Sequence, residues 1–209
     1  MSAVHRFRMS MVKYLGKTIT PEVAAAIEAE AFSEPERSID PMRFAPKVYR
    51  GLVFAIEGFR DISGELQALH EAHWQETERA RAGLALRPRY EYLNAADRRG
   101  ELLQVTAREN GALVGHARFY LFDDIHTSTR GAKEDAFFLQ PQVRRGFNAI
   151  RLWQYAERCL ADLGVLEVRT DSKVLHDAEG NVIRNVGRLN EFLGYQHVSN
   201  GYLKRLTKE

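Results

Sequence analysis

The sequence predicts an α/β (α+β) fold, with a mixed, mostly antiparallel central sheet and helices on both faces. The clearest signal is a hairpin. Residues 102–107 and 113–122 are strand-like, and Asn110-Gly111 between them supplies the two positive φ angles that a tight hairpin turn requires. The second signal is a strand–helix–strand crossover over residues 136–170. Such crossovers join parallel strands, so the sheet combines both kinds of pairing.

A long helix is expected at the centre of this crossover, over about residues 145–163. Apolar residues recur there at helical spacing: Ala149, Leu152, Ala156, Cys159 and Leu163. Gly164 ends the helix, as glycine commonly does. The flanking strands are expected over residues 136–139 and 165–170.

The remaining elements of the domain are shorter. Residues 52–56 predict a strand, and Ser63 is expected to cap the helix that follows it. Pro88 begins a second short helix. Another helix ends at Leu193-Gly194-Tyr195, and a final antiparallel pair of strands is expected over residues 198–206.

Residues 1–48 predict an N-terminal extension, which is followed by the main domain over residues 49–209. Thr20-Pro21-Glu22 is typical of a helix start, with a hydroxyl cap, a proline at the first helical position and an acid near the positive dipole end. This helix should run to about Phe32, after which prolines mark an irregular connection. We expect the extension to pack on the domain or on a neighbouring subunit, which leaves a homodimer open.

Composition limits the partners and the compartment. Hydrophobic residues make up 44% and charged residues 28% of the 209 residues, which is the mix of a globular protein. The net charge of +2 provides no global field toward nucleic acid or anionic lipid. A lone cysteine, Cys159, excludes a disulfide framework and a cysteine-based zinc site. Lys13 and Lys17 interrupt any signal-peptide core, and no stretch has the apolar length of a membrane span. We therefore expect a cytoplasmic protein without a membrane partner.

The segment from Phe137 to Ile150 runs from a strand through a turn into a helix start. A helix N-terminus has unpaired N–H groups and a positive dipole end, so it holds phosphate oxygens well. Gly146 lets the backbone approach an anion closely, and Arg144 and Arg145 add charge-assisted donors. The segment therefore predicts an anion site. The alternative is a strand-to-helix turn with a solvated arginine pair.

This turn resembles the pyrophosphate loop of the GNAT superfamily of N-acetyltransferases, which reads Gln/Arg-x-x-Gly-x-Gly/Ala. Arg144 and Ala149 match its first and last positions. Phe147 stands where the central glycine is expected and Gly146 lies one residue early, so the loop is divergent.

Flanking motifs support the resemblance. Leu139-Gln140-Pro141 matches the apolar-x-Pro strand end before the loop, and Leu193-Gly194-Tyr195 is similar to the family's Leu-Gly-Phe/Tyr signature before the last strands. The resemblance covers about residues 49–206, and the order and spacing of the motifs make it fairly specific. Similar proteins are often encoded by bacteriophages and bacteria.

The resemblance implies a GNAT-like acyl-CoA N-acyltransferase fold and an enzyme that moves an acetyl group from acetyl-CoA to a primary amine by direct attack. The acceptor stays open: a small amine, a protein lysine or N-terminus, or an amine on a modified nucleoside. The residues implied to bind acetyl-CoA, the co-substrate, are Phe137, Phe138, Leu139, Arg144, Arg145, Gly146, Phe147, Asn148, Ala149 and Ile150.

The family often removes the amine proton with a carboxylate on the strand before the loop. The resemblance puts Asp135 first for this role and Glu134 second. Strand alternation places Asp135 on the same face as Phe137 and Leu139, with Glu134 on the opposite face. The alternative is that both carboxylates lie in solvent.

The family's general-acid tyrosine has no counterpart in the expected zone, residues 189–191, which hold Leu, Asn and Glu. Protonation of the leaving thiolate is then expected to fall to Tyr202 or to water. A catalytically silent descendant stays open for this reason.

Three further residues are candidates for binding the acceptor. His126 follows the end of the hairpin strand and could bind substrate, act as a base or cap a turn. His73 and Trp74 lie on a helix face that could line the acceptor side. The histidines of His70-Glu71-Ala72-His73 are three residues apart rather than the four that a zinc-protease helix needs, so no metal site is expected.

Two other functions stay open. A Mom-like nucleic-acid-modifying protein would use a basic aromatic surface, formed by Arg79, Arg81, Arg87, Arg89, Tyr90 and Tyr92. Nucleic acid is the less favoured partner, because the same residues suit a solvated helix and loop. A GNAT-fold binding or assembly module without catalysis would act through residues 1–48.

Overall fold

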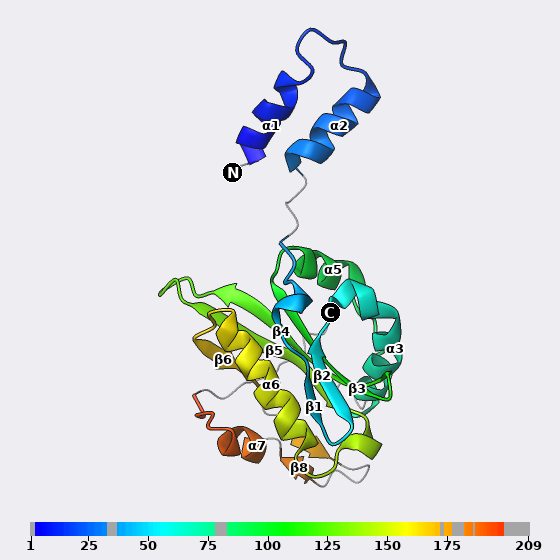
Figure 1. Ribbon diagram of the computed structural model, residues 1–209, viewed down its shortest axis with the longest axis vertical. Coiled ribbons are helices and arrows are strands. Elements are labelled where there is room, and N and C mark those ends of the chain that lie inside the picture. Colours follow the sequence, from blue (N-terminus) through cyan, green and yellow to red (C-terminus); the bar gives the residue numbers. More distant parts are fainter. Residues whose placement is uncertain are drawn as a thin grey trace, which may run out of the picture. The chain divides into compact units, whose positions relative to one another are not determined.

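The computed structural model describes residues 3–32, 37–77, 83–171, 174–176, 182–185 and 187–198. The chain divides into two compact units, Met1–Arg37 and Ser38–Glu209 (Figure 1). The division lies upstream of the position expected after residue 48. The physical reason is that residues after Ser38 already belong to the second unit: Phe44 is buried in its core, and β1 (Lys47–Tyr49) pairs within its sheet.

The first unit is a pair of helices, α1 (Ala3–Val12) and α2 (Pro21–Phe32). The expected start of α2 is confirmed, because the backbone N–H of Val23 donates to Thr20 Oγ1. The α1 helix was not expected from the sequence. The Ser10 hydroxyl donates to Glu30 at 2.8 Å, and Lys13 forms an ion pair with the same carboxylate. These polar contacts fasten the two helices to each other.

The second unit is built on a six-stranded sheet with the strand order β1-β2-β3-β4-β5-β6. The pairs from β1 to β5 are antiparallel and the β5–β6 pair is parallel, which confirms the predicted mixed, mostly antiparallel sheet. The strands after β1 are β2 (Leu52–Ile56), β3 (Leu102–Glu109), β4 (Ala112–Asp123), β5 (Arg130–Leu139) and β6 (Glu167–Arg169). The hairpin between β3 and β4 turns at Asn110 (φ 50°) and Gly111 (φ 84°), as predicted.

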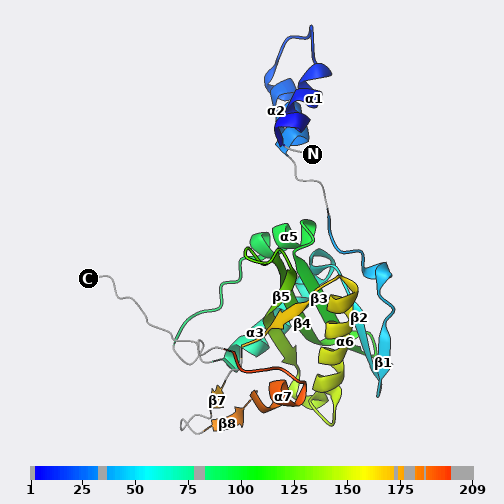
Figure 2. The same cartoon turned by 90° about the vertical axis from the view of Figure 1, so that its left-hand side faces the viewer.

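Helices cover both faces of this sheet, as the sequence predicts (Figures 1 and 2). One face carries α3 (Phe59–Gln75) and α5 (Tyr90–Arg98), and the other carries α6 (Asn148–Asp162). Among the described residues, the other elements are two 3₁₀ turns, a small hairpin and a short helix: η1 (Pro41–Arg43), η2 (Pro141–Val143), β7 (Val174–His176), β8 (Val182–Asn185) and α7 (Gly187–Phe192). In the described part of the chain, each helix is too short or too polar to cross a bilayer.

Two buried clusters hold the helices to the sheet. On the α6 face, Trp153 packs edge-on against Phe119 and Phe137, at centroid distances of 5.5 and 5.0 Å. On the other face, Phe59 and Leu66 of α3 meet Leu93 of α5 in a separate cluster. The sheet is therefore covered by buried apolar residues on both faces.

Three helix starts differ from the sequence-based expectation. The α3 helix begins at Phe59 after the extended Gly58, and Ser63 lies inside it, donating to the carbonyl oxygen of Arg60. The α5 helix begins at Tyr90 rather than at residue 88. The α6 helix begins three residues later than expected, because Gly146 adopts a φ of +57°, which a right-handed helix does not admit. The expected final strand pair lies largely outside the described residues.

Candidate functional site

The parallel strands β5 and β6 separate shortly after they meet. Their pairing is confined to Gly131–Glu167, Ala132–Val168 and Lys133–Arg169. The β5 strand continues to Leu139, whereas β6 ends at Arg169. A cavity of about 360 Å³ opens beside the unpaired half of β5. Its walls come from the end of α3, from β5, from the turn before α6, and from residues that follow β6.

The turn that leads from β5 into α6 forms one wall of this cavity. Gly146 and the first-turn residues Ala149 and Ile150 line it. The side-chain amide of the buried Asn148 donates to the carbonyl oxygen of Val143 at 2.9 Å, which holds the turn in shape. The first N–H groups of a helix have no intrahelical partner, so the start of α6 offers hydrogen-bond donors at the cavity wall.

The residues implied to bind acetyl-CoA divide into two sets. Those that line the cavity are Phe137, Phe138, Leu139, Arg144, Gly146, Ala149 and Ile150. Arg145 and Phe147 are exposed beside the turn, and Asn148 is buried beneath it. The structure thus brings most of the predicted set to one cavity, while Asn148 has a structural contact with Val143.

Arg144 is held in the cavity wall rather than solvated. Its Nη2 donates to Glu76 Oε1 at 2.9 Å, and its Nε donates to the carbonyl oxygen of Leu139. The guanidinium carbon lies 4.8 Å from the centre of the Phe138 ring. This residue therefore ties the turn to the end of α3, a contact between segments far apart in the sequence. Sequence reasoning missed Glu76 because no local pattern marks such a partner.

Arg50 is a second residue that sequence reasoning missed. It lies in the turn between β1 and β2 with a φ of +49°. A Cβ atom built on Gly146 would lie 3.0 Å from Arg50 Nη1, so this guanidinium stands directly beside the turn. The turn before α6 consequently has a further cation next to it. This cation comes from the turn after β1, the edge strand at the other end of the sheet from β6.

A β-bulge decides which of the two candidate bases, Glu134 and Asp135, shares the face of Phe137. Opposite them, Phe119 pairs with Glu134 and Arg118 pairs with Ala136, so Asp135 is the extra residue. The bulge interrupts the expected alternation, and Glu134 lines the cavity together with Phe137. The expectation that Asp135 shares the face of Phe137 is therefore wrong.

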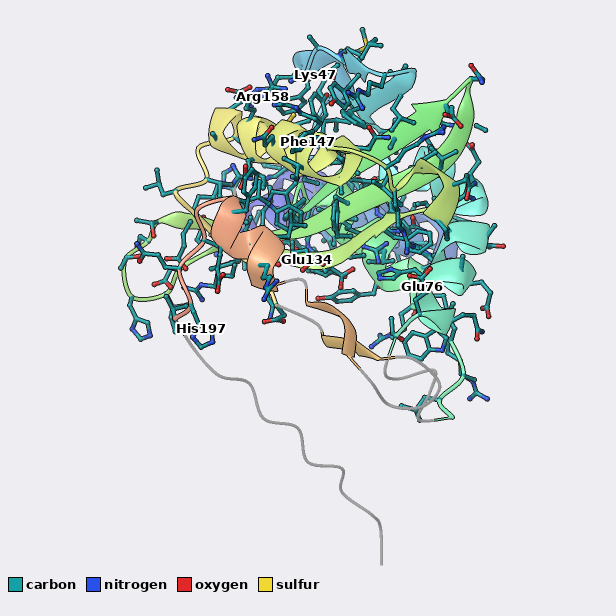
Figure 3. All side chains as sticks on the ribbon, turned by 90° about the horizontal axis from the view of Figure 1, so that it is seen from below. Lys47, Glu76, Glu134, Phe147, Arg158 and His197 are labelled. Atoms are coloured by element: carbon teal, nitrogen blue, oxygen red, sulfur yellow. The ribbon has the colours of Figure 1, made fainter. Side chains whose placement is uncertain are left out.

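Glu134 is half-buried and accepts a hydrogen bond from Thr170 Oγ1 at 3.0 Å. Figure 3 shows it beside the end of α7. Thr170 and Asp171 follow β6 and line the same cavity, as do Leu189 and Asn190 of α7. The last two belong to the zone in which the resemblance implies a tyrosine.

Asp135 belongs to a polar network on the other face of the sheet. Arg118 Nε donates to Asp135 Oδ2 at 2.7 Å, and Arg118 Nη1 lies 3.2 Å from His70 Nε2. Because arginine can only donate, His70 Nε2 accepts and its Nδ1–H donates to the Tyr90 hydroxyl at 2.9 Å. Burial, with the nearby Arg118 charge, lowers the pKa of His70 to about 4, so this histidine is neutral.

His116 lies beneath this network and is fully buried. Neither of its ring nitrogens has a hydrogen-bond partner among the described residues. Burial, with the charge of Arg118, holds the pKa of His116 well below its usual value. The ring stays neutral and packs edge-on against His70 at a centroid distance of 5.2 Å.

The three residues considered for binding the acceptor lie in three different places. His73 lines the cavity and stacks on Phe138 at 5.1 Å. Trp74 turns to the loop after α3, where its Nε1–H donates to the carbonyl oxygen of Leu84. His126 is exposed in a turn capped by Asp124, which accepts from the backbone N–H of His126 at 2.9 Å. Of these candidates, only His73 is among the residues that line the cavity.

Other candidates lie partly outside the described residues. This holds for Tyr202, and for Arg79 and Arg81 of the proposed basic aromatic surface. Tyr90, from the same surface, contacts His70 through its hydroxyl. Across the described ranges, no three histidine, cysteine, aspartate or glutamate side chains gather as a metal site. Cys159 is buried on α6, and burial raises its pKa to about 11.

One of three comparisons with known proteins bears on the fold. The sequence matches no protein-family model and no curated protein. The structure matches solved structures. A ribosomal-protein-alanine N-acetyltransferase from Brucella melitensis biovar Abortus is 20% identical, with a TM-score of 0.57 over 75% of this chain and 99% of that one.

Two further neighbours are an aminoglycoside acetyltransferase from an uncultured soil metagenomic sample and a predicted acetyltransferase with acetyl-CoA from Clostridium acetobutylicum. The first is 13% identical, with a TM-score of 0.59 over 75% of this chain and 99% of that one. The second is 13% identical, with a TM-score of 0.55 over 74% and 96%. A GNAT-family acetyltransferase from Staphylococcus aureus is also similar. The α/β unit of this protein therefore has the fold of the GNAT acetyltransferases, as the order and spacing of its motifs led us to expect.

Proposed function

We propose that this protein is an acyl-CoA-dependent N-acyltransferase that moves an acetyl group from acetyl-CoA to a primary amine by direct attack. The observation that carries the proposal is the cavity beside the separated strands β5 and β6. It combines the start of α6, which offers hydrogen-bond donors, with the carboxylate of Glu134. The acetyltransferase fold of the structural neighbours supports the same chemistry.

The turn before α6 fits a diphosphate. Gly146 carries no side chain at the cavity wall, and Arg144, Arg145 and Arg50 lie in or beside the turn. Charge-assisted hydrogen bonds from guanidinium groups to phosphate are stronger than neutral ones. The aromatic wall formed by Phe137 and Phe138 suits the less polar part of the same molecule.

Glu134 is the better-placed base. When bound, acetyl-CoA supplies an activated thioester, and the acceptor amine must be neutral to attack it. Glu134 lies in the cavity wall and can take the ammonium proton there. Asp135 is engaged with the buried Arg118 across the bulge, so we place it second. This order reverses the one that the sequence suggested.

The remaining roles stay proposals. His73 is assigned to the acceptor side because it lines the cavity, while Trp74 and His126 are weaker candidates. Tyr202 or water is assigned to protonation of the thiolate. The lone buried Cys159 and the use of acetyl-CoA fit a reducing cytoplasm.

The first test is binding followed by turnover. Isothermal titration calorimetry should detect acetyl-CoA, and a panel of amines should then release free thiol. In the double variant Arg144→Ala, Arg145→Ala, we expect acetyl-CoA affinity to fall about tenfold or more, because each charged hydrogen bond contributes about 1.5–3 kcal/mol. Unchanged affinity in the double variant would place the diphosphate elsewhere.

The second test compares the two carboxylates. Glu134→Gln should lower turnover about 10²–10⁴-fold with little change in acetyl-CoA affinity, because a positioned base contributes that much. The loss should shrink at high pH, where more of the acceptor is already neutral. Asp135→Asn is the matched comparison, made at the neighbouring position. A larger loss in Asp135→Asn at every pH would return the role to Asp135.

A further inference from the structure

Glu76 occupies an electrostatically unfavourable place. It is the C-cap residue of α3, and its backbone N–H donates to the carbonyl oxygens of His73 and Trp74. A helix C-terminus carries a partial negative charge, so a carboxylate there needs a cation close by. Figure 3 shows Glu76 at the end of α3. Its partner is Arg144, at 2.9 Å, and the two side chains are 35% and 20% exposed.

Two contacts hold the inner part of the Arg144 side chain in place. Only its outer contact, the one to Glu76, can be exchanged for another. Its Nε donates to the carbonyl oxygen of Leu139, and its guanidinium lies over Phe138. The contact to Glu76 is made by the terminal Nη2. Arg144 is also part of the turn that the proposed function assigns to the diphosphate. A diphosphate carries more negative charge than one carboxylate and takes charge-assisted hydrogen bonds well, so it is the stronger competitor for Nη2.

The other carboxylates that line the cavity have partners of their own, which do not change when Arg144 moves from Glu76 to a phosphate. Glu134 accepts from Thr170, and Asp171 lies 3.4 Å from Lys133 Nζ. If Arg144 turns to phosphate, Glu76 loses the cation that its position requires. It then becomes a negative group in the cavity wall, separate from the base that takes the proton of the reacting amine.

We propose that Glu76 binds a second ammonium group of the acceptor, and that its ion pair with Arg144 makes this binding conditional on acetyl-CoA. This inference rests on the proposed function and names the substrate class: an amine with at least one further positive charge, such as a diamine or polyamine. Arg144 neutralises Glu76 in the free protein. With acetyl-CoA bound, Arg144 contacts the diphosphate, and the acceptor's second ammonium takes its place on Glu76.

The first part of the test measures acetyl-CoA affinity by calorimetry, without any acceptor. Glu76→Gln frees Arg144, so the variant should bind acetyl-CoA about 1.5- to 5-fold more tightly, the range of measured ion-pair energies at partly exposed sites. In an Arg144→Ala background, Glu76→Gln should change nothing. Glu71→Gln is the matched control, since Glu71 is on the same helix but contacts Gln75 on the exposed surface.

The second part measures binding of 1,5-diaminopentane and pentylamine, with and without CoA. The diamine should bind about fivefold or more tightly when CoA is present, a coupling of ordinary size, and CoA affinity should rise by the same factor in the presence of diamine. Pentylamine should show no such coupling, and Glu76→Gln should abolish it for the diamine.

The outcomes separate the two proposals. A wild-type protein that binds no acetyl-CoA overturns the proposed function. Normal acetyl-CoA binding that Glu76→Gln leaves unchanged, or equal behaviour of diamine and monoamine in the CoA complex, overturns this inference and leaves the proposed function standing.

Discussion

The two units of the chain are held together in different ways. In the helix pair α1–α2, the buried side chains among those described are Ser10, Ile27 and Ala31. Many of its large apolar residues are exposed: Val4, Phe7, Met9, Val12, Leu15, Ile19 and Phe32. In the α/β unit, by contrast, Phe54, Phe59 and Phe119 are fully buried. Burial stabilises the second unit, whereas the first relies on helix formation and polar contacts.

This difference follows from size. A unit of about 40 residues or fewer buries too little apolar surface to be stable alone and usually needs a partner or a cross-link. The α/β unit has a sheet with helices on both faces and two buried clusters. We therefore expect the measured stability of the protein to report the α/β unit, with the helix pair contributing little.

The largest contrast is expected from a pair of core substitutions. Phe119→Ala should destabilise the protein by about 3–5 kcal/mol, because it leaves a cavity between the sheet and Trp153. Ile27→Ala removes a buried residue from the helix pair, and we expect the main unfolding transition to stay where it is. Chemical denaturation followed by tryptophan fluorescence measures both. A comparable loss in the two variants would show that the helix pair and the α/β unit unfold together.

Acidification should weaken the α/β unit selectively. The folded-state pKa of His70 is lowered from 6.5 to about 4 by burial, and that of His116 is also lowered. Below pH 6.5 these histidines bind protons in the unfolded chain but stay neutral in the folded protein. The free energy of unfolding therefore decreases as the pH falls toward 4. For His70 alone the loss is about 3 kcal/mol. Above pH 6.5 these histidines are neutral in both the folded and the unfolded state, so they do not make the free energy of unfolding depend on pH.

Denaturation curves between pH 4 and 7 check this prediction. His70→Gln should show a shallower loss of stability on acidification than the parent, whatever its stability at pH 7. His126→Gln is the control, because His126 is exposed. An identical slope in parent and His70→Gln would mean that His70 ionises normally in the folded protein.

Two truncations locate the boundary between the units. Removal of residues 1–37 should leave the cooperative transition of the α/β unit intact, because the division falls at Ser38. Removal of residues 1–48 also deletes Phe44, a core residue, and part of β1. We expect that longer truncation to cost about 1.5–3 kcal/mol more, the contribution of one large buried apolar side chain. Equal midpoints for the two would show that residues 38–48 add nothing to the domain.

The smallest effect is expected from the polar contact that joins α1 and α2. Lys13→Ala removes an ion pair with Glu30 whose members are 59% and 42% exposed. Such exposed pairs contribute little, so the main transition should not move. Far-UV circular dichroism of the isolated 1–37 peptide should show slightly lower helix content than the parent peptide. A shift of the main transition would reveal a contact between the helix pair and the rest of the protein.

Much of the fold could be predicted from local patterns. Asn110-Gly111 specified the β3–β4 turn, Thr20-Pro21 specified the start of α2, and the apolar stripe along α6 specified the face that packs on the sheet. These signals work because turn geometry, helix capping and helical periodicity act between neighbouring residues. The α1 helix gave no such signal, and its contact with α2 depends on residues 17 and 20 positions apart.

The sequence by itself determined the order of the described helices and strands from β2 to β6, the position of the turn before α6 and the presence of carboxylates on β5. Only the tertiary structure decided which carboxylate meets the cavity. The bulge at Asp135 sends Glu134 into the cavity wall, and a bulge depends on the partner strand β4. Tertiary structure also brought Arg50 to Gly146 and Glu76 to Arg144, across 96 and 68 residues of chain respectively. Such contacts are set by how the sheet and helices pack, and no local pattern encodes them.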